Sequence, residues 1–132
     1  MGRYVANRLV EYFKNKNIKN KKICIFGITF KEDCTDIRNS QIPQIYYNLK
    51  KNGAHVDIYD PLANINAVRN EYKIDLKSIN ELYEQNYDAI IIAVNHTNFK
   101  KMGFKNIKKL GKKNVVIYDL KWTFKNEQIQ LR

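Results

Sequence analysis

The segment from Gly27 to Ser40, GITFKEDCTDIRNS, carries residue types that bind an anion. Lys31 lies near its start, and Arg38 lies just before a predicted helix whose free N–H groups also favour negative charge. Phe30 offers an aromatic face that packs on a base or a ribose. The alternative is that Phe30 belongs to the core at a strand end and that the charged side chains of the segment pair with one another. Both interpretations stay open on the residues alone.

The same segment argues against a standard dinucleotide site. It holds one glycine, Gly27, where a dinucleotide fingerprint needs G-x-G-x-x-G. The glycine-rich turn that usually binds a pyrophosphate is therefore not expected here.

Cysteine and histidine side chains offer other chemistry. Cys34 acts as a nucleophile only if its pKa is depressed, and Lys31 and Arg38 are the nearby cations able to do this. Cys24 falls within a hydrophobic strand and is predicted to be core. The two cysteines have neither C-x-x-C spacing nor a histidine pair, so we expect neither a disulfide scaffold nor a metal site. His96 follows a predicted strand, where it either meets a ligand or forms hydrogen bonds within a loop.

Length and composition favour one globular domain. The chain has 132 residues, of which 44% are hydrophobic and 28% are charged. The longest apolar run, Ala89–Val94, is too short to cross a bilayer, and no apolar stretch follows a basic N-terminal segment. These features predict a reduced, cytoplasmic protein.

The net charge of +11 suits a polyanionic partner such as nucleic acid. Lysine supplies nineteen of the 24 basic residues, however, and the lysine pairs fall at predicted helix surfaces and ends. A solvated basic face explains such pairs without any partner.

Hydrophobic periodicity predicts an alternation of helices and strands. The predicted helices are Arg3–Phe13, Ser40–Asn52, Pro61 to about Asn70, a short helix behind a Ser78–Glu81 capping box, and Phe99 to Leu110 with a break near Gly103 and a stop at Gly111. The predicted strands are Lys22–Ile28, Ala54–Tyr59, Tyr87–Val94 and Asn114–Leu120. Nearly continuous apolar strands between helices indicate a parallel sheet in an open α/β fold, in which ligands bind beyond the carboxyl ends of the strands.

The string from Gly27 to Ser40, together with HVDIYDPLA, YDAIIIAVNHTNF and VVIYDLK, resembles the C-terminal UDP-binding domain of the UDP-glucose/GDP-mannose dehydrogenase family. The similarity spans about Lys22 to Thr123, and the D-I-R-N-S string is most similar to the bacterial branch that oxidises UDP-N-acetylhexosamines. The resemblance implies a Rossmann-like open parallel sheet with helices on both faces. It further implies that residues 1–15 end a long linking helix that forms a homodimer, that residues 16–21 are a linker, and that residues 22–132 form the UDP-sugar-binding domain.

In this family, the activity implied is oxidation of a sugar C6 alcohol to a carboxylate with NAD, which makes a UDP-uronic acid for surface polysaccharide synthesis. The resemblance places the catalytic cysteine and the main NAD-binding domain before the segment present here, so this chain is expected to be inactive alone and Cys34 to belong to a domain-closing loop. It assigns Phe30, Lys31 and Lys121 to the UDP-sugar and Arg38 to the NAD pyrophosphate. Trp122 departs from the small residue common at its position.

Two other functions are compatible with the sequence. One is a stand-alone basic module that binds a nucleotide or a nucleic acid. The other is a structural remnant that dimerises through the Arg3–Phe13 helix. Basic residues clustered at the carboxyl edge of the sheet favour ligand binding, whereas a basic stripe along helices favours nucleic acid.

Overall fold

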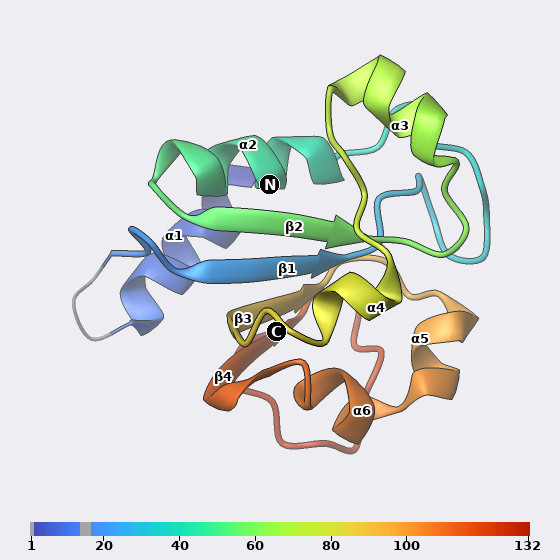
Figure 1. Cartoon of the computed structure of the whole chain (residues 1–132). Helices are drawn as coiled ribbons and strands as arrows, with labels where there is room; N and C mark the ends of the chain where they lie inside the picture. The colour runs from blue at the N-terminus through green and yellow to red at the C-terminus, as the bar shows by residue number, and fades with distance from the viewer. Residues whose placement is uncertain (1, 14–16) are drawn as a thin grey trace.

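A computed structural model describes residues 2–13 and 17–132. Its centre is a four-stranded parallel sheet with the order β2-β1-β3-β4. The strands are β1 (Lys22–Phe26), β2 (His55–Tyr59), β3 (Tyr87–Ile92) and β4 (Gly111–Asp119). Figure 1 shows them side by side with their arrowheads at one edge. The predicted open parallel α/β fold is confirmed.

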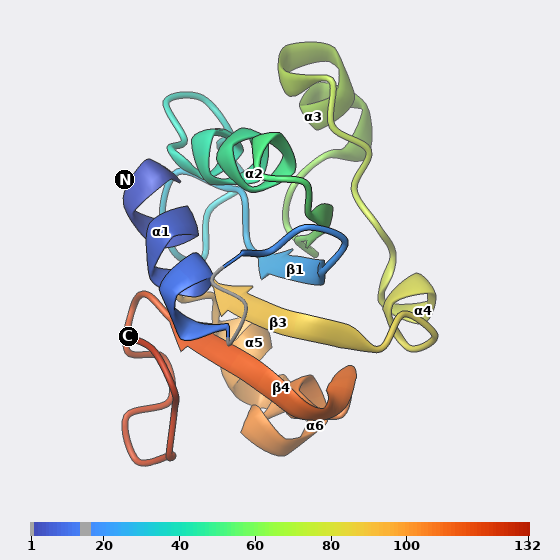
Figure 2. The same cartoon turned by 90° about the vertical axis from the view of Figure 1, so that its left-hand side faces the viewer.

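Helices cover both faces of this sheet (Figure 2). They are α1 (Gly2–Tyr12), α2 (Ile42–Lys51), α3 (Ile65–Tyr72), α4 (Ile79–Leu82), α5 (Thr97–Met102) and α6 (Phe104–Lys108). The face under α1 and α2 holds the larger apolar cluster, and the face under α5 and α6 holds the second. This division follows from strand geometry, because successive side chains of a strand point to opposite faces.

Strand β1 illustrates the division. Ile23 and Ile25 are fully buried on the α1/α2 face, whereas Cys24 and Phe26 are fully buried on the α5/α6 face. A strand buried on both faces carries an unbroken apolar run, which is why I-C-I-F after Lys22 predicts a central strand. Burial also raises the pKa of the Cys24 thiol, as expected for a core cysteine.

Helix α1 packs directly on the domain. Val5, Ala6 and Leu9 are buried in the larger cluster, and the helix lies against α2. Gly2 permits a close approach, because a Cβ there would lie 2.7 Å from the backbone carbonyl of Gln44. The division into residues 1–15, 16–21 and 22–132 remains a prediction, and Met1 and residues 14–16 lie outside the described residues.

One predicted helix begins later than expected. Pro61 does not open α3, because the Asp60 side chain accepts a hydrogen bond from the Leu62 N–H and makes a turn there (2.9 Å). The helix begins at Ile65, and the side chain of Asn64 caps it by accepting from the Ala67 N–H at 2.9 Å.

Two other element boundaries bear on the sequence predictions. Gly111 starts β4 rather than simply ending the preceding helix, which stops at Lys108. The predicted break at Gly103 and the Ser78–Glu81 capping box are confirmed.

Candidate functional site

The strand order changes direction between β1 and β3, which are neighbouring parallel strands. From β1 the chain moves to β2 at one edge, and after β2 it returns past β1 to β3 and then β4. The segments after β1 and β3 therefore diverge and leave a crevice at their carboxyl ends, where open α/β sheets bind ligands.

Gly27 shapes the first of these segments. Its φ is +103°, and a Cβ there would lie 2.6 Å from the Cβ of Val94, which follows β3. Glycine is therefore required both for the backbone conformation and for the close approach of the two segments.

A cleft of about 490 Å³ opens at this edge, and we call it the carboxyl-edge cleft. Phe30 and Lys31 from the segment after β1 and Lys121 from the segment after β4 line it together. Phe30 is 56% exposed, so its ring is not part of the core at the strand end. The volume lies in the range of small-molecule sites, roughly 300–1,000 Å³.

Other side chains of this cleft were not identified from the sequence. Tyr4 comes from α1, Asn95 follows β3, Tyr118 lies near the end of β4, and Arg132 lies at the end of the chain. Of these four, Asn95 carried a usable signal, because it closely follows a predicted strand. The other three reach the cleft through tertiary packing.

Contacts of the C-terminal segment hold Arg132 at the cleft. Leu131 bridges to Tyr118 beside β4. The Arg132 guanidinium donates from Nη2 to the carbonyls of Phe124 (3.1 Å) and Glu127 (2.9 Å), and its central carbon lies 4.3 Å from the centre of the Trp122 ring. This large ring therefore has a packing partner at a position where the backbone φ is +55°.

Arg38 lies apart from the carboxyl-edge cleft. Its guanidinium makes a two-pronged pair with Asp36, Nε to Oδ1 at 3.0 Å and Nη2 to Oδ2 at 3.1 Å, and its side chain is 81% exposed. The pair lowers the pKa of Asp36. Arg38 lines a separate shallow hollow with Asn70 and Glu71 of the α3 region. The structure thus brings Phe30, Lys31 and Lys121 together but leaves Arg38 outside this group.

Cys34 and His96 both form hydrogen bonds within the loops at this end of the sheet. The Cys34 sulfur accepts a hydrogen bond from the Asp36 N–H at 3.3 Å, which shapes the loop. His96 is fully buried and forms hydrogen bonds with Asp60 and the Asp33 N–H. The prediction of a loop hydrogen-bonding histidine is confirmed.

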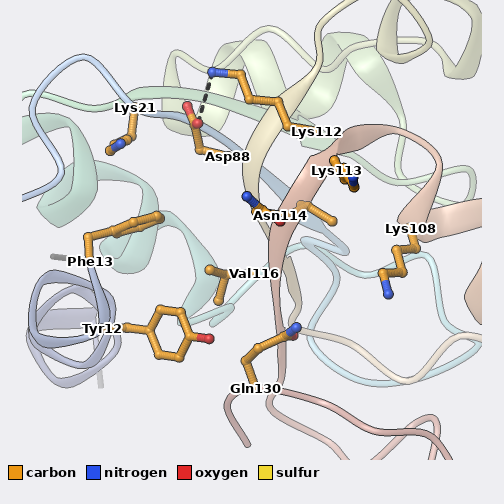
Figure 3. Close-up of a pocket in the computed structure, with 11 residues that line it drawn as sticks. Tyr12, Phe13, Lys21, Asp88, Lys108, Lys112, Lys113, Asn114, Val116 and Gln130 are labelled. Carbon is orange, nitrogen blue, oxygen red and sulfur yellow. Dashed lines mark ion pairs between the residues drawn. The ribbon is translucent and has the colours of Figure 1, made fainter.

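A second hollow, the amino-edge groove, lies at the opposite ends of the strands (Figure 3). Its volume is about 920 Å³, and its lysines are Lys21, Lys108, Lys112 and Lys113. Lys112 pairs with Asp88 at 3.0 Å. Positive side chains therefore gather at both edges of the sheet rather than only beside the carboxyl-edge cleft.

Two kinds of feature are absent from the part of the chain that the structure describes. No cluster of histidine, cysteine or carboxylate side chains able to hold a metal ion occurs among those residues. No helix among them is both long and apolar enough to span a membrane.

A parallel sheet with its cleft at the switch point is the arrangement of Rossmann-like ligand-binding domains, and the geometry above places the chain in that class. Residues 24–126 match the UDP binding domain of the UDP-glucose/GDP-mannose dehydrogenase family. The chain belongs to this family.

Known proteins similar to the chain carry consistent names. It is 41% identical to a UDP-N-acetyl-D-glucosamine 6-dehydrogenase of Salmonella typhi, over 100% of this chain and 31% of the relative. It is 35% identical to a UDP-N-acetyl-D-mannosamine dehydrogenase of Methanococcus aeolicus, over 93% of this chain and 27% of the relative. A UDP-glucose dehydrogenase structure from Pyrobaculum islandicum has the same fold, with a TM-score of 0.71 at 20% identity over 98% of this chain and 28% of that one. The chain spans about a third of the length of these relatives.

Proposed function

We propose that the chain is the nucleotide-sugar-binding part of an NAD-dependent UDP-sugar 6-dehydrogenase that acts on UDP-N-acetylhexosamines. The reaction is oxidation of the sugar C6 alcohol to a carboxylate, giving a UDP-uronic acid for surface polysaccharide synthesis. The observation that carries the proposal is the convergence of Phe30, Lys31 and Lys121 on one cleft at the switch point. The sequence similarity to two UDP-N-acetylhexosamine dehydrogenases supports the choice of sugar class.

Each of the three side chains has a physical task in this proposal. The exposed ring of Phe30 provides a flat apolar surface for the uracil or the ribose. The ammonium groups of Lys31 and Lys121 lie on the same cleft and act as point charges on the diphosphate. Both lysines are exposed, so their ammonium groups are accessible to a ligand that enters the cleft.

The residues described here do not fit a complete NAD site. The turn after β1 carries one glycine, and Arg38, the side chain assigned to the NAD pyrophosphate, is paired with Asp36 outside the cleft. We therefore assign most NAD binding, and the chemical steps, to the region of the relatives that this chain does not span. That region and a second copy of the enzyme, held through the helix that contains α1, are the proposed partners. The two free cysteines fit a reducing compartment such as the cytoplasm.

Calorimetric titration of the chain with UDP tests this function. We expect weak but measurable binding, because only part of the closed site is present. Lys31→Ala and Lys121→Ala should each weaken binding, whereas Lys105→Ala, an exposed lysine on α6, should leave the dissociation constant unchanged. The chain mixed with NAD and a UDP-sugar should yield no NADH. Absence of UDP binding, or equal losses in all three variants, contradicts the proposal.

A further inference from the structure

His96 joins the three segments that follow β1, β2 and β3. Its Nε2 lies 3.0 Å from the Oδ2 of Asp60, which follows β2. Its Nδ1 lies 3.0 Å from the backbone nitrogen of Asp33, in the segment after β1. The side chain is fully buried, so it contacts these neighbours rather than solvent.

These contacts determine where the ring proton lies. A backbone N–H is able only to donate, so Nδ1 of His96 must accept from Asp33. The proton of the neutral ring is then on Nε2 and points at the Asp60 carboxylate. The Thr29 hydroxyl lies 3.2 Å from the same nitrogen and donates to the carbonyl of Lys31 at 2.9 Å.

Asp60 anchors the other side of the network. Its Oδ2 accepts from the backbone N–H groups of Ile28 (2.8 Å) and Thr29 (3.3 Å), and its Oδ1 accepts from Leu62. Burial by itself raises the pKa of this carboxyl, but the hydrogen bonds from His96 and the backbone outweigh burial and lower it. Asp60 is therefore a carboxylate with fixed donors, and it holds the turn that begins the Phe30–Lys31 segment.

A second attachment lies next to the histidine. The Asp33 carboxylate accepts from the backbone N–H and the hydroxyl of Thr97, both at 2.7 Å. Thr97 is the residue after His96 and the first of α5. The segment Thr29–Asp33 is thus tied at its start through Asp60 and at its end through His96 and Thr97, with Phe30 and Lys31 between the two attachments.

We propose that His96 is a positioning residue, which fixes the segment Thr29–Asp33 so that Phe30 and Lys31 face the carboxyl-edge cleft before the ligand arrives. This inference rests on the proposed UDP-sugar function. When a loop is already ordered, the free-energy cost of ordering it on binding is smaller, so its ligand binds more tightly. The role also explains why a buried histidine, which packs against the Phe99 ring, has a hydrogen-bond partner on each ring nitrogen.

Three variants of His96 separate its two hydrogen bonds. The Asn side chain places an oxygen where Nδ1 lies, so His96→Asn keeps the acceptor for the Asp33 N–H. The Gln side chain reaches the position of Nε2, so His96→Gln keeps the donor to Asp60 and loses that acceptor. His96→Ala removes both.

The readouts are the UDP dissociation constant from calorimetry and the hydrogen-exchange protection of the Asp33 amide. We expect His96→Ala and His96→Gln to bind UDP about tenfold more weakly, which corresponds to about 1.4 kcal/mol, and to lose protection at Asp33. His96→Asn should stay within about threefold of the parent chain and keep that protection. Long-range ¹H–¹⁵N spectra of the parent chain should show the proton on Nε2.

Thr97→Val tests the same attachment of the segment independently, in case a His96 variant does not fold. This substitution removes the exposed hydroxyl hydrogen bond to Asp33 and keeps the bond from the Thr97 N–H, so the variant should fold and should weaken UDP binding in the same direction by about threefold. If the parent chain binds no UDP, the proposed function fails. If the parent binds UDP and loses affinity with Lys31→Ala, while the folded His96 variants and Thr97→Val bind like the parent, the positioning role alone is overturned.

Discussion

Gly27 shows how one missing side chain sets the geometry of the cleft. Its left-handed φ and its contact with Val94 both exclude a Cβ. We expect Gly27→Ala to lower the free energy of unfolding by about 3–4 kcal/mol, the sum of backbone strain and overpacking. Gly103→Ala is the matched control, because Gly103 has a φ of +85° but a Cβ added there would meet no atom within 4 Å. It should cost about 1–2 kcal/mol in urea unfolding, and equal losses for both glycines contradict the close-approach argument.

Lys31 and Arg38 make separable predictions in the full-length enzyme. Lys31 lies on the cleft, so Lys31→Ala should chiefly raise the KM for the UDP-sugar. The resulting fall in kcat/KM should correspond to about 1.5–3 kcal/mol. Arg38 is assigned to NAD, so Arg38→Ala should chiefly raise the KM for NAD. Asp36→Asn, which weakens the pair that holds Arg38, should lower the KM for NAD if the arginine must leave Asp36 to bind the pyrophosphate. Steady-state kinetics with each substrate varied in turn measure all three. A variant that unfolds, or KM values that stay unchanged, would show that the loop is structural.

Residue types predicted part of this candidate site, but the hydrogen-bond partners of its residues could not be predicted from the sequence. The aromatic and the lysine of the segment after β1, Phe30 and Lys31, are local features, and their assignment to the UDP-sugar stays a prediction from the resemblance. The contacts of His96 with Asp60 and Asp33 join residues 36 and 63 positions apart. Such contacts depend on the strand order, which no local pattern contains. Arg38 and Asp36 are close in sequence, but the sequence did not distinguish their ion pair from the binding of Arg38 to an anionic ligand.

At the scale of elements, helix α3 begins behind an N-cap at Asn64, whereas the sequence predicted a helix start at Pro61. Asn64 accepts from the Ala67 N–H at 2.9 Å, so Asn64→Ala should reduce the free energy of unfolding by about 1 kcal/mol. Asn66→Ala, an exposed change within the same helix, should be neutral or slightly stabilising, because alanine has the higher helix propensity. Thermal unfolding of both variants measures the difference. A destabilised Asn66→Ala with an unaffected Asn64→Ala would place the helix start elsewhere.

Strand positions were easier to predict than helix starts for a physical reason. A strand buried on both faces is apolar over its buried length, so β1 and β3 stand out by the runs I-C-I-F and A-I-I-I. A helix start is set by which of several polar side chains makes the cap. Asp60 and Asn64 both suit such a role, and only the hydrogen bonds of the folded chain distinguish the turn from the cap.

For the whole molecule, the buried Asp60 carboxylate links stability to pH. A carboxyl whose pKa is lower in the folded than in the unfolded chain contributes stability that is complete above the unfolded value, about 3.9, and that is lost as pH falls through the folded value. Asp60→Asn should therefore be less stable than the parent by about 2 kcal/mol at pH 7. This difference should shrink as the pH falls below about 4. Urea unfolding across that range measures it, and a difference that stays constant with pH contradicts the linkage.

The net charge of +11 also acts on the whole molecule, and it predicts an interaction that is independent of UDP. Lysines of the amino-edge groove lie at the opposite strand ends from the carboxyl-edge cleft. Duplex DNA should therefore bind without sequence preference, and the affinity should fall steeply between low and physiological salt, because counterion release then contributes less free energy. We expect the DNA to contact the lysines of the amino-edge groove, so saturating UDP should leave the DNA affinity unchanged, as fluorescence anisotropy would measure. Sequence-selective binding that resists salt, or displacement of DNA by UDP at constant ionic strength, would instead favour a nucleic-acid function for this domain.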